Sequence, residues 1–390
     1  MQRRSLLIGT AATLASHVGP TFGQTPPAAD ETTGLSGKAA LIELGKTPPN
    51  YETPLSALTT PLTARASFFV HYHLPVVPDR SALAEWALTI SGDAAGKSVQ
   101  LSLDDLKTLP QHELAAVCEA AGNRRSLATP PVAGLQWGLG GMSCALWRGP
   151  LLRDVLALAG IAPVAVEIAA NGPDRDPAAA YPRYAKSLPI DRATNDLTLI
   201  ALTINDDELP IPNGYPARLV VPGWSGAYWI KHVNQLEVRS QPLDNPWMAH
   251  ADRLPAGLFP GSAFPSQQRP DTVPITDLLI NSLATSHADG ARVRADGFTL
   301  SGMAWDNGSG IAEVEIMTSN ADTWGTAMLG IEESPYAFRP WSIQIAASRG
   351  PFSVQIRAHA KSGASQPDRA VPNPGGYHQN AVQTLNLIAV

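Results

Sequence analysis

The chain has 390 residues, of which 44% are hydrophobic and 16% charged, the balance of a globular protein. This length exceeds what one compact core usually supports, so we expect two domains. The formal net charge of -6, with lysines and arginines scattered along the chain, offers no basic surface for DNA or RNA and excludes the nucleic-acid-binding class.

The N-terminus has the composition of an export signal. A charged start with Arg3 and Arg4 precedes an apolar run that reaches Ala15, and small residues follow before Gln24. The paired arginines followed by leucines favour the twin-arginine route for residues 1–24, although a general secretory signal with a chance arginine pair has the same features. No later apolar run reaches the roughly 18 to 20 residues needed to cross a bilayer. We therefore expect a soluble periplasmic protein with no membrane span in the mature chain.

Residues 25–268 combine predicted strands with a few short helices. Residues 25–66 are rich in Pro, Thr and Ala and predict a loosely ordered arm. Alternating or aromatic runs predict strands, and leucines at helical spacing next to cap residues predict helices. The mixture predicts an α+β domain over residues 67–268. The expected strands are 67–74, 86–92, 197–204, 217–221 and 229–238, and the expected helices are 101–107 and 151–160.

Residues 273–390 have a different pattern. Short alternating runs recur with turn residues between them, and Asp306-Asn307-Gly308-Ser309-Gly310 is one such turn. Regular strands separated by turns predict an immunoglobulin-like β-sandwich, with the proline-rich segment 265–274 as the linker between the domains. The expected strands are 297–305, 312–316, 352–358 and 384–388.

The cysteines and two neighbouring histidines leave alternatives open. Cys118 and Cys144 are too few for a disulfide framework, and they either pair in an oxidising compartment or stay as buried thiols. The sequence has no Cys-x-x-Cys-His motif, so no covalent haem is attached and any electron acceptor is a separate molecule. His71 and His73 share one face of a predicted strand. They are either metal ligands without an evident third partner or polar residues of a pocket wall.

A specific motif lies at residues 117–126, Val-Cys-Glu-Ala-Ala-Gly-Asn-Arg-Arg-Ser. It resembles the segment that carries the metal-ligating cysteine in the sulfite oxidase family of molybdenum enzymes, where Cys, a small residue, Gly and Asn precede two positions that end in Arg. Further similarity extends over roughly residues 60–390, including 68–74, 214–231 and 246–255. The resemblance implies a molybdopterin-binding α+β domain followed by an immunoglobulin-like dimerisation domain.

The resemblance also implies a Mo-molybdopterin cofactor and the residues that contact it. Arg218 and Lys231 would clamp the phosphate of the pterin, Arg as a bidentate fork and Lys as a point charge. His73 and Asn123 would hydrogen-bond the cofactor, and Arg125 would face an anionic substrate.

Three positions depart from the family pattern at the reacting centre. The position of the ligand cysteine holds Ala120, whose methyl group cannot coordinate a metal. The substrate-binding Arg is replaced by His71, which is largely neutral near pH 7, and the active-site Tyr by Asp252, which adds a negative charge. Cys118 is the candidate substitute metal ligand, because in an extended chain it faces the same side as Ala120, about 6.6 Å along. Cys144 is a second candidate donor.

The expected function is oxidation of sulfite or a related small oxyanion at molybdenum. Oxygen would come from water, electrons would pass to a separate cytochrome c, and the second domain would form a homodimer. In this hypothesis Arg125, His71 and Asp252 occupy the catalytic positions. A second hypothesis is a catalytically degenerate relative that acts as a pterin-binding scaffold or partner subunit. A third is redox chemistry on another substrate at an altered metal site that uses Cys118.

Overall fold

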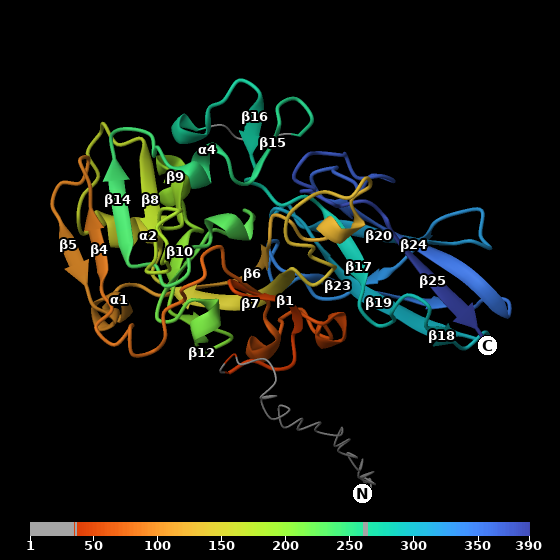
Figure 1. The fold of residues 1–390 in the computed structure, drawn as a ribbon. Helices are drawn as coiled ribbons and strands as arrows, with labels where there is room; N and C mark the ends of the chain where they lie inside the picture. The colour runs from red at the N-terminus through yellow and green to blue at the C-terminus, as the bar shows by residue number, and fades with distance from the viewer. Residues whose placement is uncertain (1–34, 36, 260–263) are drawn as a thin grey trace, which may run out of the picture.

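The computed structural model describes residues 35, 37–259 and 264–390, which form two β-rich lobes side by side (Figure 1). The predicted export signal, residues 1–24, lies outside the described residues. No helix in the described part of the chain is long and apolar enough to cross a membrane.

The first domain is built on small sheets rather than on one large one. Its largest sheet has five strands, and β14 runs parallel to β4 while the other pairs are antiparallel. The order is β5 (Val99–Leu101), β4 (Leu88–Ser91), β14 (Gln235–Arg239), β8 (Glu167–Asn171) and β9 (Ala185–Pro189). A second sheet has the order β12 (Asp207–Glu208), β11 (Thr203–Ile204), β7 (Met142–Gly149) and β6 (His112–Glu119), and a third pairs β10 (Leu199–Ala201) with β13 (Arg218–Val220).

Short helices cover the edges of these sheets. Helix α1 (Leu103–Thr108) begins at Ser102 with the expected capping box, in which Ser102 and Asp105 each bond the other's backbone N–H. Helix α2 (Leu152–Ala157) buries Leu152, Val155 and Leu156, so both predicted helices are confirmed. The remaining helices are α3 (Ile190–Ala193) and α4 (Pro246–Ala249).

Two predicted strands are shorter than the sequence pattern suggested. Within 67–74 only β3 (Val70–His71) pairs, because the segment follows a 3-10 turn and consecutive residues from Phe68 to Val70 are all buried. Within 229–238 only β14 pairs, since the chain first passes through His232, which has a positive φ of 53°. The predicted strand 197–204 is divided between β10 and β11.

The prediction of a loosely ordered arm over residues 25–66 is wrong for its described part. Strands β1 (Ile42–Lys46) and β2 (Pro49–Glu52) form a hairpin, and β2 pairs with β3. Lys38 and Thr63 from the same segment are buried in the first domain. The proline and threonine content of this segment therefore reflects turns within packed structure. The pairing of β2 with β3 places Asn50 opposite His71.

The second domain confirms the predicted sandwich. One sheet has the order β17 (Asn281–Ala284), β19 (Phe298–Trp305), β23 (Arg339–Ile345) and β22 (Met328–Leu329). The facing sheet has the order β18 (Arg292–Val293), β25 (Gln383–Ala389), β24 (Gly350–Ala360), β20 (Ile311–Thr318) and β21 (Gly325–Thr326). The predicted linker is itself structured, because β16 (Thr272–Pro274) pairs with β15 (Arg253–Pro255).

A shared core joins the two domains behind β6, the strand that carries Cys118. Val117 and Cys144 from β6 and β7 pack in one cluster with Met303 and Trp305 from β19. The indole Nε1 of Trp305 also donates a hydrogen bond to Oε2 of Glu119, at 2.9 Å. The C-terminal end of β6 is therefore held from both sides, which fixes the wall of the site described next.

Candidate functional site

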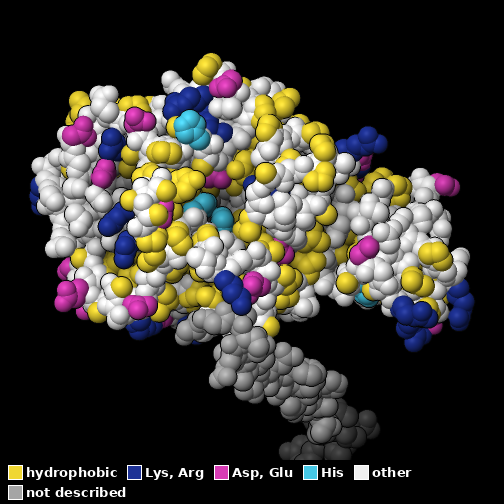
Figure 2. Space-filling model, in the orientation of Figure 1, with side chains coloured by type: hydrophobic (Ala, Val, Ile, Leu, Met, Phe, Trp, Pro, Cys, Tyr) yellow, Lys and Arg dark blue, Asp and Glu magenta, His cyan; other side chains and the backbone are white. Residues whose placement is uncertain are grey.

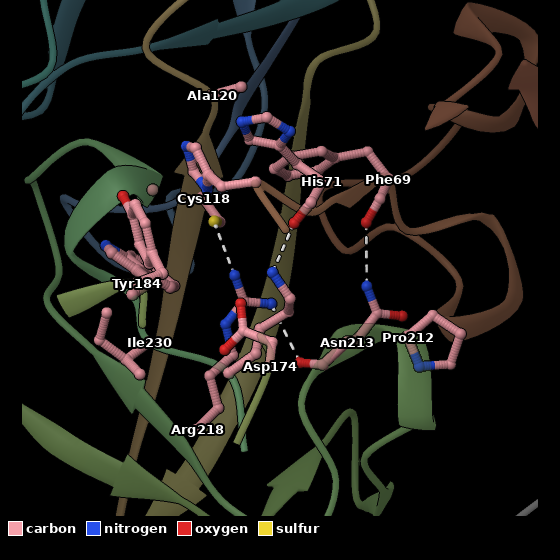
Figure 3. Close-up of a pocket in the computed structure, with 14 residues that line it drawn as sticks. Phe69, His71, Cys118, Ala120, Asp174, Tyr184, Pro212, Asn213, Arg218 and Ile230 are labelled. Carbon is pink, nitrogen blue, oxygen red and sulfur yellow. Dashed lines mark hydrogen bonds between the residues drawn. The ribbon is translucent and has the colours of Figure 1, made fainter. Parts of the chain in front are cut away.

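The candidate site is a cavity in the first domain, into which side chains from distant segments point (Figure 3). Strand β3 and the turn after it, the end of β6, the segment before and at β13, and the turn before β14 contribute its walls. On the surface, histidine side chains lie near the middle of the face in Figure 2, among hydrophobic ones. The lining residues are Phe69, His71, His73, Cys118, Ala120, Asp174, Tyr184, Pro212, Asn213, Arg218, Gly226, Trp229, Ile230 and Lys231.

One part of the cavity, here called the basic end, is formed by Arg218, Lys231, Asn213 and Cys118. Arg218 donates from Nη1 to the carbonyl of Asn213 at 3.1 Å and from Nη2 to Sγ of Cys118 at 3.4 Å. Its Nε is buried and has no hydrogen-bond partner among the residues that the structure describes. Lys231 donates from Nζ to the carbonyl of His71 and lies 3.8 Å from the centre of the Tyr72 ring. Within the described residues neither cation forms an ion pair with a carboxylate.

The charges of the basic end are therefore poorly compensated by the protein itself. Burial, followed by the neighbouring Arg218, lowers the pKa of Lys231 to about 7, and Asp174 opposes this only in part. Burial also lowers the pKa of Arg218. Because an isolated buried charge is costly, an anion in the cavity would stabilise both groups. The basic end has the chemistry of a phosphate site.

A third buried cation, which the sequence did not point to, stands behind the basic end. Lys38 is 1% exposed and donates from Nζ to Oδ1 of Asn213 at 2.7 Å and to the carbonyl of Arg65 at 2.8 Å. Burial and the charges of Arg65 and Arg218 hold its pKa well below the usual value. Lys38 does not line the cavity, so it acts there through Asn213.

The opposite part, here called the imidazole end, is formed by His71, His73, Tyr184 and Ala120. The rings of His71 and His73 are 4.4 Å apart, and His73 stacks on Tyr184 with centroids 4.0 Å apart and an interplanar angle of 8°. Burial, then nearby positive charges, hold the pKa values of both histidines well below the usual range. Both imidazoles are therefore neutral near pH 7.

Ala120 supplies no metal ligand at the imidazole end, and Cys118 is the thiol that lines the cavity. In Figure 3, Ala120 and His71 lie at one end of the view and Arg218 at the other, and the sulfur of Cys118 points toward Arg218. Burial raises the pKa of the Cys118 thiol, and Arg218 and Lys231 oppose that shift. Nowhere in the described part of the chain do three His, Cys, Asp or Glu residues gather as a metal site.

Arg125 is buried beside the cavity rather than lining it. Its Nε donates to the carbonyl of Gly375 at 2.8 Å and its Nη1 to that of Leu135 at 3.0 Å, and the guanidinium lies 4.9 Å from the centre of the Tyr377 ring. These contacts use two of the five N–H donors of the guanidinium. The predicted contact of Arg125 with an anionic substrate stays a prediction.

Asn123 and Asp252 are likewise engaged by neighbouring protein groups. Asn123 donates to Oε1 of Glu119 at 2.8 Å and accepts from the N–H of Gly141 at 3.0 Å. Asp252 lies 2.9 Å from Nζ of the buried Lys186, and its φ of 54° turns the chain at this point. The structure therefore brings together His71, His73, Cys118, Arg218 and Lys231 on the cavity wall, and it places Arg125, Asn123 and Asp252 behind it.

The cavity suits the phosphate of the cofactor that the resemblance predicts, but it offers no thiol at the family's metal-ligand position. The phosphate fits the basic end, where, within the described part of the chain, the buried Arg218 Nε has no hydrogen-bond partner and the two cations have no carboxylate partner. Gly214, with a φ of 114°, allows the backbone to pass close to the two residues that carry the cations, since a Cβ there would lie 3.2 Å from both Arg218 and Lys231. At Ala120 the chain offers no thiol. The missed residue Asn213 lies next to the strongly matching segment 214–231, a signal that could have found it.

Comparisons with known proteins agree that the first domain binds molybdopterin. The family model of the oxidoreductase molybdopterin binding domain matches residues 73–247, and that of the Mo-co oxidoreductase dimerisation domain matches residues 272–387. Mitochondrial sulfite oxidase of Macaca fascicularis is 32% identical over 389 residues, which cover 95% of this chain and 69% of that protein. Nitrate reductase [NADH] 1 of Oryza sativa subsp. japonica is 27% identical, covering 87% of this chain and 40% of that protein.

A solved structure shows the same fold. The sulfane dehydrogenase SoxCD from Paracoccus pantotrophus superposes with a TM-score of 0.76 at 23% identity, covering 95% of this chain and 93% of that chain. The two family models together span the cavity domain and the sandwich in the order in which the chain has them. The chain therefore belongs to the sulfite oxidase family of oxidoreductases, whose cofactor is Mo-molybdopterin.

Proposed function

We propose that the protein oxidises sulfite or a related small oxyanion and passes the electrons to a separate cytochrome c. The observation that carries the proposal is the pair of buried cations, Arg218 and Lys231, that face one cavity without a carboxylate partner in the described residues. When bound, the cofactor supplies the redox centre. Arg218 and Lys231 hold its phosphate, while His71 and His73 line the side that a small substrate reaches.

Cys118 is proposed as the protein's metal ligand in place of the absent thiol at Ala120. Its sulfur lines the same cavity; burial raises the pKa of the thiol, and the positive charge of Arg218 opposes that shift. To serve this role the sulfur has to leave its contact with the Arg218 guanidinium, 3.4 Å away. In Cys118→Ser the molybdenum content should fall while the pterin content stays, because Arg218 and Lys231, the two cations of the basic end, are unchanged. Unchanged molybdenum content would rule the role out.

A second candidate function is a pterin-binding scaffold or partner subunit without catalysis. Ala120 favours it, because the basic end keeps the anion-binding groups whereas the position of the metal ligand holds a methyl group. The two functions differ in metal content and turnover, and they agree in pterin content.

One experiment separates these functions. The protein is expressed with a full supply of cofactor, and bound molybdenum, bound pterin and sulfite-dependent reduction of cytochrome c are measured on the same sample. Stoichiometric molybdenum with turnover supports the enzyme and contradicts the scaffold. Pterin without molybdenum or turnover supports the scaffold. Absence of both pterin and molybdenum contradicts both functions.

Location and assembly complete the proposal. Residues 1–24 would direct export to the periplasm by the twin-arginine route, and the second domain would form a homodimer, as the name of its family model suggests. Replacing Arg3 and Arg4 with Lys should leave the protein in the cytoplasm, as fractionation would show. Sedimentation of the purified protein would give twice the mass of one chain for a dimer, each chain having 41.2 kDa before residues 1–24 are removed.

A further inference from the structure

The side chain of Asn50 has an orientation that neighbouring backbone groups determine. Asn50 lies on β2 directly opposite His71 on β3. Its Oδ1 accepts from the backbone N–H of Tyr72 at 3.1 Å, and its Nδ2 donates to the carbonyl of Pro48 at 3.0 Å. A backbone N–H can only donate and a backbone carbonyl can only accept. The amide oxygen of Asn50 therefore faces β3, and it cannot exchange places with the nitrogen.

This orientation determines which nitrogen of His71 carries the proton. Nδ1 of His71 lies 2.5 Å from Oδ1 of Asn50, which is an acceptor, so Nδ1 has to be the donor. In a neutral imidazole the other nitrogen, Nε2, then carries a lone pair. No hydrogen bond from the described residues engages Nε2, and His71 lines the cavity. The imidazole end thus presents an acceptor where the family has a cationic donor.

The groups around His71 are consistent with a neutral ring. Its ring contacts that of His73 at 4.4 Å and meets the Trp137 ring edge-on at 5.1 Å. The charged groups that influence it are Lys231, Asp252 and Arg125, and Asp252 alone of these favours the protonated ring. Asp252 is itself paired with the buried Lys186 at 2.9 Å. The surroundings therefore leave Nε2 unprotonated and available to a ligand.

We propose that Asn50 is a positioning residue that holds His71 in the Nδ1–H form, so that the imidazole end takes an oxyanion that still carries a proton. Nε2 accepts a hydrogen bond from the O–H of such a ligand, whereas a fully ionised oxyanion would place its own lone pairs against that of Nε2. The ligand class rests on the proposed function, since it takes this cavity as the substrate site. The role of Asn50 does not, because it concerns the protein alone.

Nitrogen NMR of the full-length purified protein tests the role of Asn50, whatever its cofactor content. Long-range proton–nitrogen spectra of histidine-labelled protein distinguish the Nδ1–H form, the Nε2–H form and the imidazolium. His71→Gln identifies the signals of His71. We expect the Nδ1–H form in the wild type at pH 7. In Asn50→Asp a carboxylate next to Nδ1 should favour the imidazolium, so Nε2 should become protonated.

Asn205→Asp is the matched control for this variant. Asn205 also accepts from a backbone N–H, that of Leu146, and donates to a backbone carbonyl, that of Thr63. Among the described residues, no hydrogen bond joins Asn205 to a histidine. It should lose the same kind of amide donor without changing the signals of His71. An Nε2–H form in the wild type would overturn the proposal even if neither variant folds. So would an Asn50→Asp spectrum in which His71 is unchanged.

An anion titration followed through the Nε2 signal of His71 tests the ligand class. Inorganic phosphate still carries a proton at pH 7, and sulfate carries none. Phosphate should shift the signal at a roughly tenfold lower concentration than sulfate, the worth of one hydrogen bond to a charged ligand. Asn50→Asp should lose this preference. A wild-type response that is equal for both anions, or absent for both, would overturn the ligand class. Failure of the proposed function would instead appear as missing pterin and molybdenum.

Discussion

The two ends of the cavity differ in how far the protein satisfies its own groups. At the basic end Arg218 and Lys231 are buried cations that lack carboxylate partners in the described residues, where Arg218 Nε also has no hydrogen-bond partner. At the imidazole end His71 is bonded through Nδ1 to Asn50, and His73 is stacked on Tyr184. The basic end therefore lacks the counter-charge that an anionic ligand would supply, whereas the imidazole end carries no charge to compensate and leaves Nε2 of His71 open to a ligand.

This contrast separates holding a cofactor from reacting with a substrate. The buried positive charge of the basic end destabilises the fold unless an anion occupies the cavity, which argues that the chain binds an anion there. Of the three substitutions that distinguish this chain, Ala120 and His71 lie at the imidazole end, and Asp252 is not among the lining residues. The structure therefore supports cofactor binding more strongly than catalysis. Variants at both ends of the cavity test this difference.

Arg218→Met should give the largest effect. Loss of charged hydrogen bonds to the phosphate should reduce pterin affinity about 10- to 100-fold, as measured by the pterin that the purified protein releases on denaturation. The cofactor-free variant should be at least as stable as the wild type, because methionine removes an uncompensated buried charge. Arg153→Met, at an exposed arginine that pairs with Asp196 on the surface, should change neither property. A less stable variant with normal pterin content would contradict a ligand-dependent basic end.

Ala120→Cys tests whether the imidazole end lacks only a thiol. Ala120 is 4% exposed and lines the cavity, so a cysteine there would place sulfur at the family's ligand position. We expect Ala120→Cys to bind as much molybdenum as the wild type, with the pterin content unchanged. The double variant Ala120→Cys, Cys118→Ser should bind several-fold more molybdenum than Cys118→Ser alone, since the new thiol replaces Cys118. If the double variant binds no more than Cys118→Ser, the imidazole end lacks more than a thiol.

Much of the fold and part of the site could be predicted from the sequence. Helix caps and alternating runs are local signals, which is why α1, α2 and the sandwich strands β19, β20, β24 and β25 were predicted correctly. Arg218 and Lys231 lie within one closely matching segment, and they do face one cavity. Residues 25–66 were misjudged because the composition of a packed hairpin with many turns is the same as that of a loose arm.

The rest of the site depends on contacts between distant segments. Lys38 reaches Asn213, and Asn50 orients His71, through pairings that leave no periodic pattern in either segment. The charge of Arg125 suits a ligand of an anionic substrate, but two of its N–H groups donate to backbone carbonyls. Which of several possible partners a side chain finds is a property of the packed chain, and one sequence does not contain it.

The basic end should also give the cofactor-free protein a distinct dependence on pH. Lys231 has a pKa of about 7 in the folded protein and about 10.4 when unfolded, so between these values the unfolded chain binds more protons. Stability should therefore rise with pH above 7, by about 2 kcal/mol at pH 9 relative to Lys231→Met. Urea unfolding of both proteins at pH 7 and 9 measures this, and the groups that do not interact with Lys231 cancel in the difference. Bound pterin should abolish the trend, because its phosphate stabilises the charged lysine. A difference independent of pH would mean that Lys231 is already compensated.

Lys38→Met should have the smallest effect, and it asks how far the basic end extends. Lys38 does not touch the cavity, but its bond to Oδ1 of Asn213 orients the residue whose carbonyl accepts from Arg218. Loss of that one bond is worth about 1 kcal/mol, so pterin affinity should fall roughly fivefold. Lys38→Arg keeps a donor and should restore part of the loss, which a variant damaged only in packing would not show. If affinity is unchanged in Lys38→Met, the hairpin segment supports the fold and the basic end stops at Asn213. If it falls as expected, residues outside the first family model take part in holding the cofactor.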